Sequence, residues 1–184
     1  MIERGINSPR TSSMGRLFDA AAAILGICGQ ATYEANPPSS LKPPLGVHWT
    51  ANRPFSRRQR RLFHIWPIMV GRPDVLDQKA LFEALLEGIE AGAPADRLAL
   101  DFHVTVARSS ARIASEICAR EGIGTVALSG GVFMNRLLLQ LLTRELKYAG
   151  LAVLVPHTVP VNDGCIAYGQ AAVASARLAQ IASQ

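Results

Sequence analysis

The C-terminal part of the chain alternates short apolar runs with helical patterns, and this alternation is the feature that most limits the possible folds. Thr125–Leu128 and Leu151–Val155 are β-branched and apolar, which is typical of buried strands. Helical spacing follows each run, over Asn135–Tyr148 and over Cys165–Ile181. Strand, helix, strand and helix in this order predict two parallel strands joined by a right-handed crossover.

Three more helices are predicted upstream of these strands. Met14–Leu25 has apolar residues at helical spacing, with Ser12 or Ser13 as its cap. Val75–Ile89 is amphipathic, and Ala95–Arg120 follows it after a turn. Together with the strands, these helices predict an α/β lobe with a small parallel sheet and flanking helices.

Residues 35–61 have a different composition from the rest of the chain. They contain five of the eleven prolines, six basic residues and no acidic residue, and they show neither helical nor strand periodicity. The rest of the chain has 13 basic and 14 acidic residues, so the net charge of +5 belongs to this segment. The basic character is therefore weak evidence for nucleic-acid binding by the folded part.

These patterns divide the chain into three parts. Residues 1–34 begin the lobe, residues 35–62 are an irregular segment rich in Pro and Arg, and residues 63–184 form the rest of the lobe with its glycine-bearing loops. The three cysteines lie far apart and form no CxxC motif, which favours a reducing, cytoplasmic compartment. We find neither a signal-peptide pattern nor an apolar stretch long enough to span a membrane, so no membrane association is expected.

The loop Ser129–Asn135 is the first candidate site. Gly130 and Gly131 follow a predicted strand, where their backbone can approach a ligand closely, and the next helix offers its N-terminus to a phosphate. Taken alone, two glycines after a strand are more often a plain turn. Asp163 lies in a second loop before a helix, where a carboxylate could either ligate a metal or cap the helix.

Two further polar residues lie within helical patterns. Asp19 either faces solvent or contacts a ribose hydroxyl. His103 is expected to be a hydrogen-bonded, half-buried residue, because the four histidines show no metal-ligand spacing.

Three stretches together resemble the HypF-type carbamoyltransferases, which are related more distantly to the tRNA threonylcarbamoyl-transfer proteins and the O-carbamoyltransferases. They read SSMGRLFDAAAAILG, VALSGGVFMNRLLLQLLTREL and VPVNDGCIAYGQAAVA, and they occur in the order found in that family. The resemblance implies one lobe of an actin-like ATPase (ribonuclease H-like) fold, truncated in this chain. It also implies that Gly130 and Gly131 lie against the phosphates of ATP, that Asn135 helps to position the nucleotide, and that Asp19 holds its ribose. Asp163 would then bind a divalent metal.

The activity implied by the resemblance is a carbamoyl transfer. Carbamoyl phosphate and ATP would give a carbamoyl-adenylate, and the carbamoyl group would pass to the C-terminal cysteine of a partner protein during maturation of nickel–iron hydrogenase. The chain departs from the family in having no HxxxH metal motif. We therefore expect an incomplete metal site and a chain that is inactive alone.

Residues 35 to about 61 are the second departure, and we interpret them as a frame-shifted stretch. Two alternatives to the transferase remain open: a non-catalytic remnant, and a nucleotide-binding lobe of a split threonylcarbamoyl- or O-carbamoyltransferase. All nucleotide-based interpretations require the loops before Asn135 and at Asp163 to lie side by side.

Overall fold

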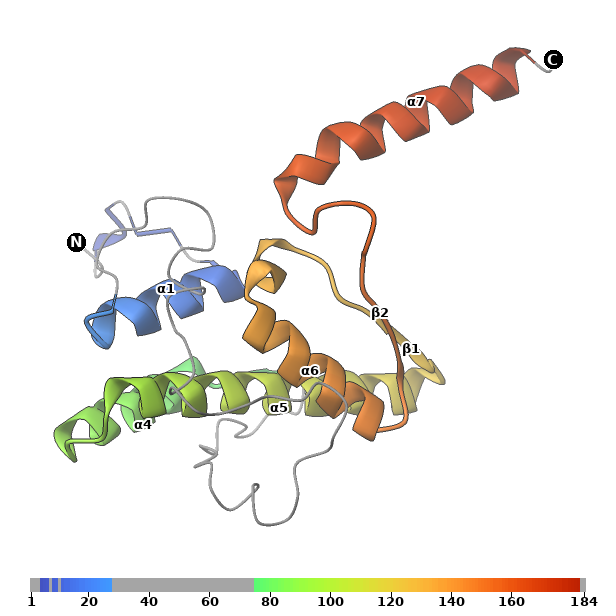
Figure 1. The fold of residues 1–184 in the computed structure, drawn as a ribbon. Helices are drawn as coiled ribbons and strands as arrows, with labels where there is room; N and C mark the ends of the chain where they lie inside the picture. Colours follow the sequence, from blue (N-terminus) through green and yellow to red (C-terminus); the bar gives the residue numbers. More distant parts are fainter. Residues whose placement is uncertain (1–3, 7, 10, 28–74, 183–184) are drawn as a thin grey trace.

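The computed structural model describes residues 4–6, 8–9, 11–27 and 75–182. The described part is an α/β arrangement in which helices pack against one face of a short parallel sheet (Figure 1). In chain order its elements are α1 (Met14–Ile24), α4 (Gln78–Glu90), α5 (Ala95–Glu121), β1 (Thr125–Ala127), η2 (Gly131–Met134), α6 (Arg136–Tyr148), β2 (Ala152–Leu154), η3 (Asp163–Cys165) and α7 (Ile166–Ala182). The predicted α/β lobe with a small parallel sheet and flanking helices is confirmed.

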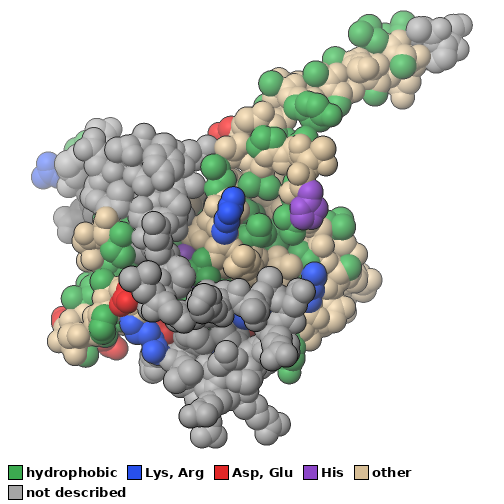
Figure 2. Space-filling model, in the orientation of Figure 1, with side chains coloured by type: hydrophobic (Ala, Val, Ile, Leu, Met, Phe, Trp, Pro, Cys, Tyr) green, Lys and Arg blue, Asp and Glu red, His purple; other side chains and the backbone are tan. Residues whose placement is uncertain are grey.

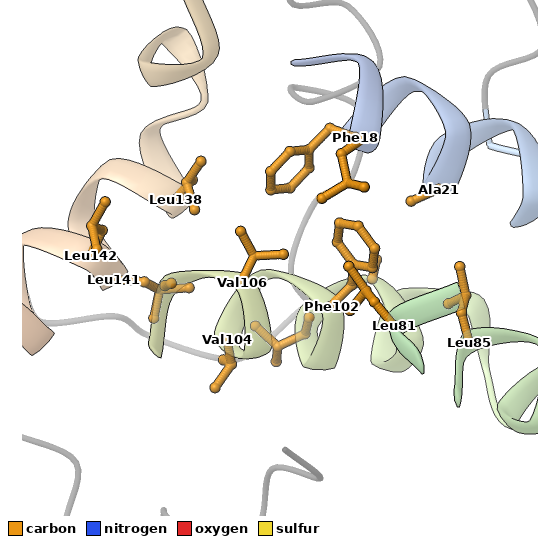
Figure 3. Packing of buried hydrophobic residues seen from close by; sticks show 14 of the residues in the cluster. Phe18, Ala21, Leu81, Leu85, Phe102, Val104, Val106, Leu138, Leu141 and Leu142 are labelled. Atoms are coloured by element: carbon orange, nitrogen blue, oxygen red, sulfur yellow. The ribbon is translucent and has the colours of Figure 1, made fainter. Parts of the chain in front are cut away.

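Helix α5 is the longest element, with 27 residues, and the other core helices pack along it. Figure 1 shows α4 lying beside it and α1 and α6 on the side nearer the sheet. The buried core combines side chains from all four helices; Figure 3 labels Phe18, Ala21, Leu81, Leu85, Phe102, Val104, Val106, Leu138, Leu141 and Leu142. Phe18 of α1 meets Phe102 of α5 edge-to-face, with ring centroids 5.2 Å apart, so aromatic packing joins the N-terminal helix to the centre of the lobe.

Helix boundaries follow side-chain caps. Ser13 caps α1 by accepting from the Arg16 N–H, and Asp77 caps α4 by accepting from the Ala80 N–H at 3.1 Å. The prediction that α4 begins at Val75 is therefore wrong by three residues, because the carboxylate of Asp77 satisfies a free N–H of the first turn. At the other end of α5, Gly122 adopts a left-handed conformation (φ +68°) and stops the helix.

Strands β1 and β2 pair in parallel, with Val126 opposite Val153. These two valines pack against the core, whereas the residues on either side of each valine are exposed. The prediction of fully buried strands is thus wrong. Alternate side chains of a strand point to opposite faces, and nothing within the described ranges covers the outer face of this sheet.

Helix α7 projects away from the other elements, as Figures 1 and 2 both show. It starts at Ile166, one residue later than expected, and none of its described side chains is buried. Large apolar side chains therefore remain at its surface: Ile166, Tyr168, Val173, Leu178 and Ile181. In the parts of the chain that the structure describes, no helix has the length and apolar character needed to cross a membrane.

Several sequence-based predictions concern residues outside the described ranges. Residues 35–62, which are predicted to be irregular and frame-shifted, lie there entirely, and so do Cys28, His48 and His64. These predictions stay as they were made.

Candidate functional site

The candidate site is the edge of the sheet at which β1 and β2 both end. Because the strands are parallel, the loops that follow them leave from the same edge. Two contacts tie the loops together: the Gly130 N–H donates to the Val161 carbonyl at 2.9 Å, and Asn162 Nδ2 donates to Met134 Sδ at 3.4 Å. The requirement that the two loops lie side by side is therefore met.

Gly130 adopts a backbone conformation that only glycine reaches without strain (φ +112°, ψ 155°). A Cβ atom built on it would meet no atom within 4 Å. The glycine is therefore required by its backbone angles, and the space beside it is open. An open approach to the backbone is what a loop needs to contact a phosphate closely.

Gly131 begins the short turn η2, which runs through Met134 into Asn135 and then α6. The Phe133 N–H donates to the Gly130 carbonyl at 3.0 Å, and the Asn135 N–H donates to the Val132 carbonyl at 3.0 Å. This compact turn leads directly into the N-terminus of α6. The backbone N–H groups and the helix dipole at that end favour binding of an anion.

Asn135 is the N-cap of α6, and both ends of its amide are engaged. Its Oδ1 accepts from the Leu138 N–H at 3.1 Å, and its Nδ2 lies 2.8 Å from Nε2 of His103. The side chain is buried, with 2% of its surface exposed. The structure thus gives Asn135 a role in holding the loop and the helix; its predicted part in positioning a nucleotide is compatible with this indirect action and stays a prediction.

His103 is the residue of this region that sequence reasoning underestimated. The prediction of a hydrogen bond is confirmed, but His103 is fully buried rather than half-buried. Burial lowers its pKa from 6.5 to about 4, against the opposing effect of its bonds to Ala99 and Asn135. The two residues are 32 positions apart, so neither periodicity nor motif spacing could have paired them.

Asp19 lies in α1, which contacts η2. Its carboxylate is half-buried and lies 3.0 Å from the guanidinium of Arg16, one turn earlier. The interpretation of Asp19 as an ordinary solvent-facing residue is thus too simple, because only 23% of its side chain is exposed. Its predicted contact with a ribose stays a prediction.

Asp163 is exposed and begins η3. The neighbouring Asn162 is the N-cap of η3 and accepts from the Gly164 N–H at 3.2 Å. Both predicted roles of Asp163, metal ligand and cap of the last helix, stay predictions. No cluster of three or more His, Cys, Asp or Glu side chains that could hold a metal occurs among the residues with described positions. One exposed carboxylate does not make a divalent-metal site, so we assign no chemical step to a metal in this chain.

Comparison with known proteins gives concordant matches in sequence and in structure. The family model "Carbamoyltransferase, Kae1-like Domain, second subdomain" matches residues 1–170. The chain is 36% identical to a carbamoyltransferase HypF homolog of Cupriavidus necator over 178 residues, covering 95% of this chain and 43% of that protein. It is 37% identical to the carbamoyltransferase HypF of Rhizobium leguminosarum bv. viciae over 175 residues, covering 95% of this chain and 21% of that one.

Two solved structures share the fold. One is a full-length HypF in its phosphate- and nucleotide-bound form, with a TM-score of 0.74 and 31% identity over 96% of this chain. The other is the HypF of T. kodakarensis, with a TM-score of 0.71 and 28% identity. The chain spans 22% and 21% of these two proteins. It therefore corresponds to a minor part of the length of the proteins it resembles.

Proposed function

The chain belongs to the HypF-type carbamoyltransferase family, as a second subdomain of the Kae1-like domain, and from this premise we propose that it is the nucleotide-binding lobe of an ATP-dependent carbamoyltransferase. The observation that carries the proposal is the loop from Ser129 to Asn135. It combines a glycine at a positive φ with open space beside it, a hydrogen bond to the neighbouring loop and a following helix N-terminus. A similar protein has been crystallised with phosphate and nucleotide bound, which supports a nucleotide as the ligand.

In this proposal the lobe binds ATP and positions its phosphates. The backbone of Gly130 and Gly131 approaches the phosphates, Asn135 holds the loop against α6, and Asp19 contacts the ribose from α1. The positive end of the α6 dipole offsets phosphate charge.

The complete reaction needs groups beyond these. Carbamoyl phosphate loses its phosphate to give carbamate, whose oxygen attacks the α-phosphorus of ATP with release of pyrophosphate and forms a carbamoyl-adenylate. The C-terminal cysteine thiol of a hydrogenase-maturation partner in the cytoplasm then loses its proton and takes the carbamoyl group, and AMP leaves. In this proposal the described residues bind the nucleotide and offset its charge, and Asp163 contributes one ligand to a divalent metal whose other ligands lie outside any cluster found among the described residues. We therefore expect the chain by itself to bind ATP without transferring a carbamoyl group.

Titration of the 184-residue chain with ATP and Mg²⁺, followed by calorimetry, tests the binding step. We expect micromolar affinity for the unmodified chain and a loss of about tenfold or more in Gly130→Ala, because a Cβ enters the space beside the loop and strains the backbone.

Gly150→Ala is the matched control for this titration. Gly150 also has a positive φ (+83°) and no atom within 4 Å of a built Cβ, but it lies at the end of α6 remote from the loop. Strain alone would affect both variants, whereas ligand contact affects only Gly130→Ala. Absence of any ATP binding by the unmodified chain would favour the alternative of a non-catalytic remnant.

Binding without transfer leaves a second function open, the nucleotide-binding lobe of a split threonylcarbamoyl- or O-carbamoyltransferase. The observation that favours it is that Asp163 belongs to no group of three or more potential metal ligands within the described ranges, so a metal bound there would need ligands from elsewhere. Supplying carbamoyl phosphate, ATP and a peptide ending in cysteine distinguishes the two when the lobe is mixed with the remaining part of a HypF protein. Carbamoylation of the thiol, detected by mass spectrometry, supports the first function.

A further inference from the structure

His103 lies where three helices meet behind the glycine loop. It is fully buried in α5, its ring packs against Phe18 of α1 with centroids 4.9 Å apart, and its Nε2 faces the cap of α6. Each of the two ring nitrogens has one polar neighbour, the Ala99 carbonyl for Nδ1 and the Asn135 amide for Nε2.

The Ala99 carbonyl and the Leu138 N–H, at the two ends of the hydrogen-bonded chain through His103 and Asn135, determine which ring nitrogen carries the hydrogen. The Ala99 carbonyl, 2.7 Å from Nδ1, can only accept, so Nδ1 carries the hydrogen. In a neutral ring Nε2 is then an acceptor, and the Asn135 amide must present Nδ2 to it. Oδ1 of Asn135 is left to accept from the Leu138 N–H. Burial, which lowers the pKa of His103 to about 4, keeps the ring neutral at pH 7.

The opposite arrangement is excluded by the same contacts. If Nε2 carried the hydrogen and Asn135 were turned over, Nδ1 and the Ala99 carbonyl would face each other as two acceptors at 2.7 Å. The Asn135 NH₂ would in turn face the Leu138 N–H as two donors at 3.1 Å. Both mismatches would be buried, where unpaired polar groups are most unfavourable.

Asn135 joins this network directly to the candidate site. It closes η2 by donating its backbone N–H to Val132, and it starts α6 through its side chain. Gly130, at the other end of η2, is bonded to Val161 of the neighbouring loop. Asn135 thus connects the buried His103 both to η2 and to the first turn of α6.

We propose that His103 is a positioning residue for the nucleotide loop: as the Nδ1–H tautomer it holds the Asn135 amide in the one orientation that caps α6 and fixes the turn after Gly130 and Gly131. The part of this inference that concerns nucleotide rests on the function proposed above. His103 acts through Asn135 and does not itself contact the ligand, because it is fully buried.

The tautomer is tested first, in the unmodified chain and without nucleotide. Long-range ¹H–¹⁵N correlation spectra at pH 7 distinguish a protonated Nδ1 from a protonated Nε2. We expect a neutral ring with the hydrogen on Nδ1 and a hydrogen-bonded Nε2. A hydrogen on Nε2, or a charged ring, would overturn the proposal.

Two variants then separate positioning from packing. His103→Gln can place Oε1 near the position of Nε2 and so keeps an acceptor for Asn135, whereas the shorter side chain of His103→Asn does not reach. We expect amide exchange at Leu138 and Gly130 to accelerate by about tenfold in His103→Asn and by no more than about twofold in His103→Gln.

Val104→Ala is the control for general destabilisation. Val104 is a buried neighbour on α5, and Figure 3 shows it on the side of the helix away from Phe18. Equal acceleration of Leu138 and Gly130 in Val104→Ala and His103→Asn would show that lost packing explains the effect, and the proposal would fail.

Measuring the affinity of each variant for ATP with Mg²⁺ tests whether the His103–Asn135 hydrogen bond affects ligand binding. We expect His103→Asn to weaken binding by about tenfold and His103→Gln by no more than about twofold, in parallel with the exchange data. If the unmodified chain binds no ATP, the proposed function fails, while the tautomer and the exchange rates still decide whether His103 positions the loop. If ATP binds equally to all variants, the function stands and the positioning role fails.

Discussion

At the residue scale, the buried imidazole of His103 couples the folding of the lobe to pH. The pKa of His103 is about 4 in the folded chain and 6.5 in its ordinary state. Between these two pH values the imidazole is therefore protonated in the unfolded chain and neutral in the folded chain. The stabilisation from the neutral ring is complete above pH 6.5 and is lost as the pH falls from 6.5 towards 4. The shift corresponds to roughly 3 kcal/mol in the free energy of unfolding.

His103→Gln provides the comparison, since glutamine does not titrate. We expect the free energy of unfolding of the unmodified chain to fall relative to this variant by up to about 3 kcal/mol between pH 6.5 and pH 4. Urea unfolding at a series of pH values measures it. Parallel pH profiles for the two proteins would contradict the assignment of a neutral, buried His103.

At the element scale, side-chain caps determine where helices α4 and α6 begin, and the two caps differ in their surroundings. Asp77 at α4 satisfies one backbone N–H at a half-buried position, whereas Asn135 at α6 satisfies Leu138 and also donates to buried His103. Removing Asp77 therefore removes a cap, and removing Asn135 also leaves the Nε2 acceptor of His103 without its partner.

Alanine substitutions should show this difference. We expect Asp77→Ala to lower the free energy of unfolding by about 1 kcal/mol, with Asp77→Ser close to the unmodified chain. Asn135→Ala should lose a further 1–3 kcal/mol or so, because a buried acceptor is left unsatisfied. A double-mutant cycle of Asn135→Ala with His103→Phe measures the coupling, and additive losses would show that the two side chains do not act together.

At the scale of the whole molecule, the core and α7 are energetically separate. The core packs α1, α4, α5 and α6 together, while α7 buries none of its described side chains and contacts mainly the adjacent η3. We expect deletion of residues 166–184 to change the melting temperature of the lobe by less than about 2 °C.

Leu146→Ala is the comparison for the melting temperature of the lobe without α7, because it removes a side chain from the core. Leu146 is fully buried on α6, and its truncation should cost 2–5 kcal/mol or so and lower the melting temperature by several degrees. Differential scanning calorimetry of both variants makes the comparison. A large loss on deletion of α7 would mean that its apolar surface is covered in solution.

Local sequence determined the elements and the residues between them. Apolar spacing placed the helices and the two strands to within a few residues, and the Gly130–Gly131 pair marked the loop, because helical periodicity and glycine turns depend on neighbours in the chain. Recognition of three motifs placed the chain in its family, which the comparisons confirm. The exact start of α4 was missed because Val75 and Leu76 continue the apolar pattern before the Asp77 cap.

Tertiary structure alone decided how these parts meet. The hydrogen bond from Gly130 to Val161 joins the two loops, and the His103–Asn135 contact joins residues 32 positions apart. The sheet is likewise buried on one face, where α6 packs, and no element within the described residues covers the other face. Such contacts arise when segments far apart in the sequence pack together. Periodicity and motif spacing describe only neighbours along the chain, so they cannot predict which distant segments meet.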